Sequence, residues 1–465
     1  MRGVGAYNVK MPDSPCHSVL LTDLYELTMA ASYFESRVRS AATFELFVRT
    51  LPENRGYLVA AGLEQALDYL QDLRFRSEEI DYLRRHAMFA HVSPAFFDYL
   101  ADFRFTGEVW AMPEGTPVFQ DEPLLRVTGP IIEAQIVETY LLSVITFQTM
   151  IATKAARLVE AAQGRGVVDF GTRRAHGPEA GVLAARAAYI GGCLGTSNVE
   201  AGLRFGISTV GTIAHSFIMA HHDEEQAFRD FARLFPENVI LLIDTYDTLR
   251  AVEKVIHMGC CPKGVRLDSG NLADLSKEVR RRLDEAGLRD TRIYASGDLD
   301  EFAITRLLAQ YAPVDFFAVG TALVTSKDAP ALGGVYKLVE VFEEQAGGAR
   351  KLPRPTAKFS ADKYTYPGSK QVFRSSGANG EYTHDVLACA GENYDGATPL
   401  LERVMRDGRR VCPSPPLDSI RERVRGLLPR LHPTVRELRN PAPYPVQISQ
   451  QLAGLLEQVR NETLR

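Results

Sequence analysis

The sequence lacks the features of a membrane-bound, secreted or nucleic-acid-binding protein. No apolar run approaches the 18 or so residues that span a bilayer, since the most apolar long segment, residues 131–162, contains Glu133, Glu138 and Lys154. The first residues lack the apolar core of a secretion signal. The 53 basic residues are outnumbered by 58 acidic ones, and the net charge of −5 argues against a broad surface for nucleic acid or anionic lipid. We expect a cytoplasmic protein with only local phosphate binding.

Paired cysteines are also missing. The six cysteines form no C-x-x-C motif and show no zinc-like spacing. The adjacent Cys260 and Cys261 could act as a redox pair, although small buried residues near a strand start are the simpler interpretation. We expect reduced thiols and no metal ion held directly by protein side chains.

What the sequence does contain is the composition of a globular protein, with 45% hydrophobic and 24% charged residues over 465 positions. This length suggests about three domains. We divide the chain into residues 1–150, 151–334, 335–412 and a helical tail, 413–465, that follows a proline-rich stretch.

The middle segment alternates short β-branched strands with helical stretches. Predicted strands start at residues 208, 239, 264, 292 and 315, which lie 31, 25, 28 and 23 residues apart. This spacing fits one strand and one helix of a parallel α/β fold. With a strand at 167–170 and a possible one at 189–194, the count is about seven, which favours an irregular TIM-like α/β barrel. A doubly wound open sheet would have the same period.

Polar and glycine residues follow these strands, at the pole where parallel α/β folds bind ligands. The candidate site residues are Arg173, His215, Asp244, Arg266, Asp268, Ser296, Gly297, Asp298, Gly320 and Thr321. The two glycine loops, 296–298 and 320–321, fall where an eightfold barrel commonly binds phosphate. Arginine suits the same site because its planar fork grips phosphate or carboxylate.

Single residues at this pole allow more than one interpretation. Asp268 could cap the next helix, or could bind sugar hydroxyls or a metal-bound water. Asp244 could be a turn residue, or could hold a magnesium–phosphate group through water. His215 could be structural, or could serve as a general base, a phosphate ligand or a phosphorylated nucleophile. The run from His221 to Glu225 lacks metal-site spacing and is typical of a solvated helix.

Taken in order, these motifs resemble those of the nicotinate phosphoribosyltransferase family. The matching stretches are TDLYELTM (22–29), DFGTRRAH (169–176), GTSN (195–198), GTIAHS (211–216), IDTYD (243–247), VRLDSGN (265–271), SGD (296–298) with GT (320–321), and KFSADKYTYPGSKQV (358–372). The resemblance covers nearly the whole chain from about residue 20 to the proline-rich tail. It implies an irregular α/β barrel joined to a second, sheet-containing α+β domain that is built from the N-terminal region and a later segment.

The resemblance implies condensation of nicotinate with phosphoribosyl pyrophosphate, assisted by ATP and Mg²⁺, to give nicotinate mononucleotide and pyrophosphate for NAD synthesis. It implies that ATP phosphorylates His215. It also implies that Phe170 and Tyr25 sandwich the pyridine ring, with Tyr25 supplied by the neighbouring subunit of a homodimer. Arg173 and Arg266 match arginines near the substrate carboxylate and phosphate.

Ser197 bears on the choice of substrate. Related nicotinamide enzymes carry an acidic residue at the matching position, and a carboxylate there would repel nicotinate, whereas a serine hydroxyl can donate to it. We therefore favour nicotinate. The alternatives are a phosphoribosyltransferase for nicotinamide or another small anion, and a catalytically silent barrel that binds nucleotides.

Overall fold

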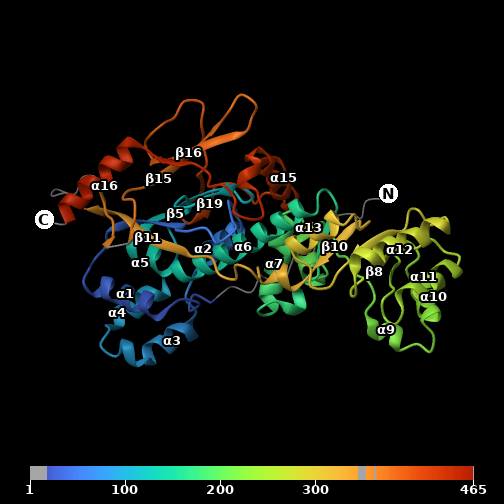
Figure 1. The fold of residues 1–465 in the computed structure, drawn as a ribbon. Coiled ribbons are helices and arrows are strands. Elements are labelled where there is room, and N and C mark those ends of the chain that lie inside the picture. Colours follow the sequence, from blue (N-terminus) through green and yellow to red (C-terminus); the bar gives the residue numbers. More distant parts are fainter. Residues whose placement is uncertain (1–17, 344–351, 361–362, 464–465) are drawn as a thin grey trace.

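The computed structural model describes residues 18–343, 352–360 and 363–463. A seven-stranded sheet with strands from both halves of the chain and a four-stranded sheet from its second half lie on one side of the molecule, and a parallel sheet surrounded by helices lies on the other (Figure 1). Within the described residues, no helix is both long and apolar enough to cross a bilayer. The chain therefore has the predicted organisation of a barrel beside a sheet-containing domain.

The larger sheet joins segments that are far apart in the sequence. Its strand β1 (Ala41–Val48) pairs antiparallel with both β11 (Gly334–Glu343) and β5 (Pro123–Pro130). The remaining strands are β12 (Leu352–Pro355) beside β11, then β3 (Glu108–Ala111), β18 (Glu402–Arg406) and β19 (Arg409–Arg410) beyond β5. Strands from the early and later segments thus share one sheet, as the resemblance implies.

Helices from the first part of the chain pack with this sheet. They are α1 (Leu24–Glu35), α2 (Leu63–Asp72), α3 (Ser77–Arg85), α4 (Pro94–Ala101), α5 (Ile131–Ile136) and α6 (Glu138–Ala161). The apolar segment at residues 131–162 forms two helices, α5 and α6, divided at Val137. The break is stabilised because Glu26 of α1 accepts a hydrogen bond from the Thr139 N–H in the first turn of α6.

The C-terminal part of the chain is not a helical tail apart from the rest of the protein, because it supplies a strand to a sheet. A four-stranded sheet runs in the order β17 (Thr398–Pro399), β15 (Lys370–Ser376), β16 (Tyr382–Cys389) and β20 (Val446–Ile448). The preceding short strand β14 (Lys363–Tyr364) pairs with β13 (Phe359–Ser360) in a separate two-stranded sheet. Strand β20 comes from the tail and lies parallel to β16, so this region is not purely antiparallel. Helix α15 (Leu417–Leu427) packs on the barrel, and α16 (Gln450–Thr463) packs on β16 (Figure 1).

The barrel contains five parallel strands. Their order is β6 (Gly166–Asp169), β10 (Phe316–Val319), β9 (Arg292–Ala295), β8 (Gly264–Leu267) and β7 (Ile240–Leu242). Two isolated parallel bridges, Asp169 to Thr196 and Thr196 to Thr209, extend the sheet past β6. The predicted count of about seven therefore corresponds to these five strands and two bridged residues.

Two of the predicted barrel strands do not form, so these two predictions are wrong. Residues 208–213 form only the bridge at Thr209, and residues 189–194 contain the end of helix α7 (Pro178–Ile190) followed by a turn. The physical reason in the second case is the helical continuation of an alanine-rich segment, because alanine has the highest helix propensity. The remaining barrel helices are α8 (Val199–Phe205), α9 (His215–Met219), α10 (Glu224–Leu234), α11 (Thr248–His257), α12 (Leu272–Glu285), α13 (Glu301–Ala309) and α14 (Thr321–Val324).

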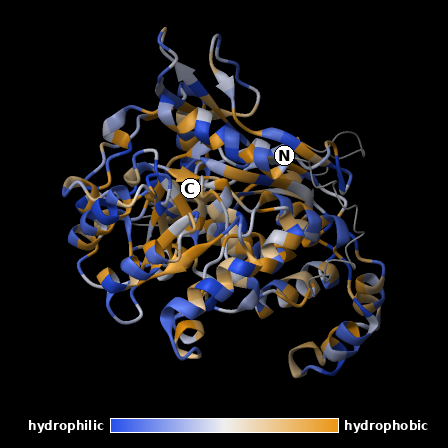
Figure 2. Cartoon of the chain, turned by 90° about the vertical axis from the view of Figure 1, so that its right-hand side faces the viewer, coloured by the Kyte–Doolittle hydropathy of each residue, from blue (hydrophilic) through white to orange (hydrophobic). Residues whose placement is uncertain are grey.

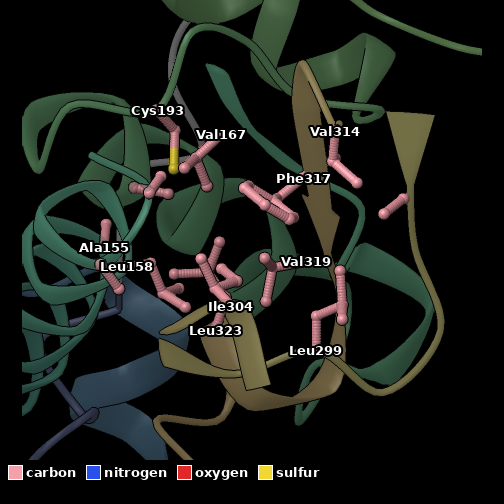
Figure 3. Packing of buried hydrophobic residues seen from close by; sticks show 14 of the residues in the cluster. Ala155, Leu158, Val167, Cys193, Leu299, Ile304, Val314, Phe317, Val319 and Leu323 are labelled. Carbon is pink, nitrogen blue, oxygen red and sulfur yellow. The ribbon is translucent and has the colours of Figure 1, made fainter. Parts of the chain in front are cut away.

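Barrel strands alternate between two environments. Val265 and Phe317 belong to the cluster that includes the surrounding helices, in which Figure 3 shows Phe317 near Val319 and Ile304. On the other face, the rings of Tyr294 and Phe316 stack with centroids 4.5 Å apart. Figure 2 shows mainly hydrophobic strands at the centre and helices with hydrophilic outer faces. The described cysteines, Cys193, Cys260, Cys261, Cys389 and Cys412, are free thiols, and Cys16 lies outside the described residues.

Close packing of α6 on the end of α7 gives a stability prediction. A Cβ added at Gly191 would lie 2.3 Å from the Ala152 carbonyl oxygen, so Gly191→Ala forces the helices apart. We expect a loss of about 1–3 kcal/mol in the free energy of unfolding, measured by chemical denaturation. Gly426→Ala is the matched control, because Gly426 lies within α15 with open space around it. It should gain roughly 0.5–1 kcal/mol; equal effects of the two changes would contradict the packing argument.

Candidate active site

The Arg266 side chain connects four segments at the carboxyl-terminal end of the barrel. Its Nε donates to Ser296 Oγ at 2.8 Å, its Nη1 donates to Thr212 Oγ1 at 2.8 Å, and its Nη2 donates to Asp268 Oδ1 at 2.6 Å. The guanidinium carbon also lies 5.6 Å from the centroid of the Phe170 ring. The three donors of one rigid, buried fork therefore fix the relative positions of two strand ends and of the segment before α9.

Asp268 belongs to the same hydrogen-bond network. Its Oδ1 accepts from Ser296 Oγ at 2.5 Å as well as from Arg266. Burial opposes ionisation of Asp268, but the hydrogen bonds from Ser296 and Arg266 outweigh it, so the pKa of this carboxyl lies below its usual value. Asp268 is therefore a carboxylate near neutral pH.

Asp244 joins His215 to this network. Its Oδ2 accepts from the Asp268 N–H at 2.9 Å and from Ser269 Oγ at 2.7 Å. Its Oδ1 lies 3.3 Å from His215 Nε2. Asp244 is thus bound to the next strand end through one oxygen and faces the histidine with the other. The His215 ring, at the start of α9, is 41% exposed and accessible to a ligand.

Phe170 and Ser197 lie side by side. The preceding Asp169 and Thr196 form a parallel bridge, and the Ser197 N–H donates to the Asp169 carbonyl oxygen at 2.8 Å. The Asp169 side chain accepts from Thr196 Oγ1 at 2.7 Å and from the Gly171 N–H at 2.8 Å. Burial raises the pKa of Asp169, and these two hydrogen bonds oppose that increase. Asp169 therefore fixes the backbone on both sides of the aromatic ring and the hydroxyl.

The two glycine loops lie next to these groups. Gly297 has a φ of +89°, and an added Cβ would lie 2.0 Å from the Asp268 carbonyl oxygen. Asp298, which follows, is exposed and also has a positive φ of 47°. A Cβ at Gly320 would lie 3.4 Å from the Phe170 carbonyl oxygen, and Thr321 begins α14. The close approach of loop 296–298 to Asp268 requires glycine.

Two predicted site residues lie apart from this hydrogen-bond network. Arg173, in the short helix after Phe170, is exposed, and no hydrogen bond or ion pair of its side chain is recorded in the described part of the chain. Tyr25 lies on α1, which packs with α4 and α5 at the opposite side of the molecule from β8 (Figure 1). Tyr25 is 46% exposed there, and partial burial beside Glu138 and Glu26 raises its pKa.

Sequence reasoning missed three residues that build the site. Thr212 accepts from Arg266, while Asp169 and Thr196 position Phe170 and Ser197. All three occur inside the recognised motifs, and Asp169 and Thr196 lie directly beside Phe170 and Ser197. Their positions next to glycine and at strand ends were the available signal, but their partners come from other strands.

Oxygen ligands for a metal ion are few. In the ranges that the structure describes, no group of three or more His, Cys, Asp or Glu side chains is arranged to hold a metal ion. The buried Asp244 Oδ1 nevertheless accepts no hydrogen bond from any described group, and Asp268 lies beside it. Two carboxylates suit a hydrated Mg²⁺ that also binds substrate phosphate, since this ion keeps several waters and usually takes one or two protein carboxylates.

The fold and the site together define an α/β-barrel enzyme whose polar groups gather at the carboxyl ends of parallel strands. Three family models match the chain: the nicotinate phosphoribosyltransferase N-terminal domain (residues 20–146), the quinolinate phosphoribosyl transferase C-terminal domain (151–329) and the nicotinate phosphoribosyltransferase C-terminal domain (393–456). These models cover the sheet-containing domain, the barrel and the tail in chain order.

Whole-chain comparisons agree. The chain is 46% identical to nicotinate phosphoribosyltransferase pncB2 of Mycobacterium tuberculosis, over 95% of this chain and 94% of the relative. It is 38% identical to nicotinate phosphoribosyltransferase of Bacillus subtilis, over 93% of each. The crystal structure of human nicotinic acid phosphoribosyltransferase matches with a TM-score of 0.81 and 30% identity, covering 94% of this chain and 99% of that one. The chain belongs to the nicotinate phosphoribosyltransferase family.

The Arg266 network gives a prediction for activity. Arg266→Lys keeps the charge but loses the planar fork, so one ammonium cannot reach Ser296, Thr212 and Asp268 in their three directions. We expect kcat/KM to fall by about a hundredfold, or about 2.7 kcal/mol, in a steady-state assay. Arg292→Lys is the matched control, because Arg292 begins the adjacent β9, is 57% exposed and pairs with Asp315. An active Arg266→Lys enzyme with unchanged kinetics would contradict this role.

Proposed function

We propose that this enzyme condenses nicotinate with phosphoribosyl pyrophosphate to give nicotinate mononucleotide and pyrophosphate, a step of NAD salvage. The observation that carries this proposal is the network of Arg266, Asp268, Asp244 and His215 at the barrel pole. It occurs in a chain that is 46% identical to a nicotinate phosphoribosyltransferase over 95% of its length.

Nicotinate is a flat anion, and the residues near Phe170 suit it. The Phe170 ring offers an aromatic face, the Ser197 hydroxyl can donate to a carboxylate, and the exposed Arg173 is available as a cation. The second aromatic face would come from Tyr25 of a second copy. The position of α1, and the exposure of Leu21, Leu24 and Tyr25 by 51%, 44% and 46%, support a homodimer with shared active sites.

Loss of pyrophosphate leaves positive charge on the ribose, so fixed carboxylates nearby lower the barrier. We assign this role to Asp268, which the Arg266 and Ser296 hydrogen bonds keep ionised. Backbone N–H groups of loops 296–298 and 320–321 would bind the phosphates. Asp244 and Asp268 would hold Mg²⁺ through water, and the ion would neutralise charge on the leaving pyrophosphate.

ATP would take part in the reaction by phosphorylating His215. Nε2 faces Asp244, which leaves Nδ1 to attack the γ-phosphorus of ATP, forming an N–P bond while ADP departs. The dianionic phosphoryl group would then alter the electrostatics of the adjoining loop and tighten binding of the pyrophosphate substrate.

A direct assay tests the function. The purified chain is incubated with nicotinate, phosphoribosyl pyrophosphate and Mg²⁺, with and without ATP, and pyrophosphate release is measured. We expect turnover of nicotinate, stimulated by ATP, and little turnover of nicotinamide. A preference for nicotinamide would support the alternative substrate, and no turnover of either would support a silent nucleotide-binding barrel.

The role of Ser197 predicts a change in selectivity. Ser197→Asp places a carboxylate beside the bound anion, so the KM for nicotinate should rise at least about tenfold. Ser197→Ala, which removes the hydroxyl without adding charge, should have a smaller effect. Undiminished nicotinate turnover by Ser197→Asp would show that this account of selectivity is wrong.

The role of His215 predicts uncoupling. His215→Ala should abolish stimulation by ATP and incorporation of phosphate from γ-labelled ATP, while slow ATP-independent turnover remains. His221→Ala is the control. His221 lies two residues past the end of α9, and its Nδ1 lies 2.8 Å from the Phe217 carbonyl oxygen. Stimulation by ATP that survives in His215→Ala would rule out the phosphohistidine.

A further inference from the structure

A buried group of charged side chains lies behind the two glycine loops. Its members are Lys154, Arg157, Glu301, Asp328 and Arg55, which we call the Lys154 network. Their side chains are 2%, 1%, 0%, 33% and 2% exposed, respectively. None of them belongs to the site residues described above.

Lys154 is the centre of this network. Its Nζ lies 2.5 Å from Glu301 Oε2 and 2.7 Å from Asp328 Oδ1. Arg157, one turn further along α6, donates from Nε to the other Glu301 oxygen at 3.1 Å. One face of α6 therefore holds two carboxylates that are 27 positions apart in the sequence, at residues 301 and 328.

Each of these carboxylates follows one of the glycine loops. Glu301 is the first residue of α13, directly after the segment that carries Ser296, Gly297 and Asp298. Asp328 follows α14, the helix that begins immediately after Gly320. A single ammonium group thus connects the start of α13, which follows the first loop, with the segment after α14, which follows the second.

The network is fixed to the rest of the molecule from the opposite side. Arg157 donates to the Asn54 carbonyl oxygen at 2.6 Å and to the Leu438 carbonyl oxygen at 2.9 Å. Arg55 Nη1 lies 2.9 Å from Asp328 Oδ2. The N-terminal sheet domain and the C-terminal segment therefore both contact the groups that bind the loop ends.

Stability alone is a weak explanation for this arrangement. Burying charges carries a desolvation penalty that the ion pairs offset only with good geometry, and apolar side chains of similar size often stabilise a core as well. Multiple directional contacts have another effect, because they fix the relative positions of the elements that carry them. In phosphoryl and glycosyl transfer, displacement of a binding loop by about 1 Å can reduce the rate about a hundredfold.

We propose that the Lys154 network positions loops 296–298 and 320–321 for binding the phosphates of phosphoribosyl pyrophosphate, so that Lys154, Glu301 and Asp328 are positioning residues. The inference rests on the proposed phosphate role of the two loops. It predicts that the network affects one substrate more than the other, because the backbone beside Phe170 and Ser197 has additional support from Asp169 and Thr196.

The test is a separate measurement of the two KM values in Glu301→Gln, using the full chain. We expect the KM for phosphoribosyl pyrophosphate to rise by about tenfold or more, while the KM for nicotinate stays within about twofold. Asp328→Asn is the second variant, because its side chain is one-third exposed and the change is easier to accommodate. Lys154→Met should also raise the KM for phosphoribosyl pyrophosphate. Lys154→Arg keeps the charge, so its KM should rise less than that of Lys154→Met.

Asp385→Asn is the matched control. It breaks a comparably buried pair, Arg374 to Asp385, with side chains 2% and 0% exposed, in the four-stranded sheet away from the loops. It should lower the melting temperature as Glu301→Gln does, without separating the two KM values. Equal changes in both KM values in Glu301→Gln and Asp328→Asn, or the same pattern in Asp385→Asn, would overturn the proposal.

Thr321→Ala distinguishes this inference from the function on which it rests. If Thr321→Ala and Gly297→Ala leave the KM for phosphoribosyl pyrophosphate unchanged, the phosphate role of the loops is wrong. If they raise it and Glu301→Gln does not, the loops bind phosphate but the Lys154 network does not position them.

Discussion

The site depends on one buried guanidinium. Arg266 binds side chains from the segment before α9, from its own strand end and from the end of β9. Because the fork is planar and rigid, moving any one partner weakens its hydrogen bond without a compensating rotation. Burial alone would raise the pKa of Asp268, and the hydrogen bonds from this fork and from Ser296 hold it below its usual value. Through the Asp268 N–H and Asp244, the same geometry extends to His215.

The parts of the fold that could be predicted from sequence are those with local signals. Strands β6 to β10 are short β-branched runs that end in polar residues, and this pattern depends on neighbours in the chain. Residues 208–213 have a similar composition, yet they pair only at Thr209, where the neighbour is the single bridged residue Thr196 and not a strand. A β-branched run is therefore insufficient where no extended neighbour lies beside it.

Contacts between distant segments could not be predicted. Glu301 and Lys154 are 147 positions apart, and Arg157 and Leu438 are 281 apart, so periodicity says nothing about either contact. The same holds for β20, a three-residue strand whose partner β16 lies about 60 residues earlier. The candidate site was easier to predict, because the carboxyl ends of parallel strands lie together at one edge of the sheet. Tyr25 was placed by resemblance alone, and its distance from the barrel in one chain follows from the packing of α1 on α5.

The charge distribution explains how a chain with a net charge of −5 can suit two anionic substrates. Arg266 adds little net positive charge to the site, since Asp268 neutralises it at 2.6 Å. A substrate anion at Arg266 would compete with that carboxylate, so the residue serves orientation more than attraction. Long-range attraction must come from cations without such a partner. Arg173 is exposed after Phe170 and has no ion pair among the described residues, so in the proposed function it would lead a substrate anion toward the aromatic face. Attraction and orientation are thus assigned to different arginines on neighbouring strand ends.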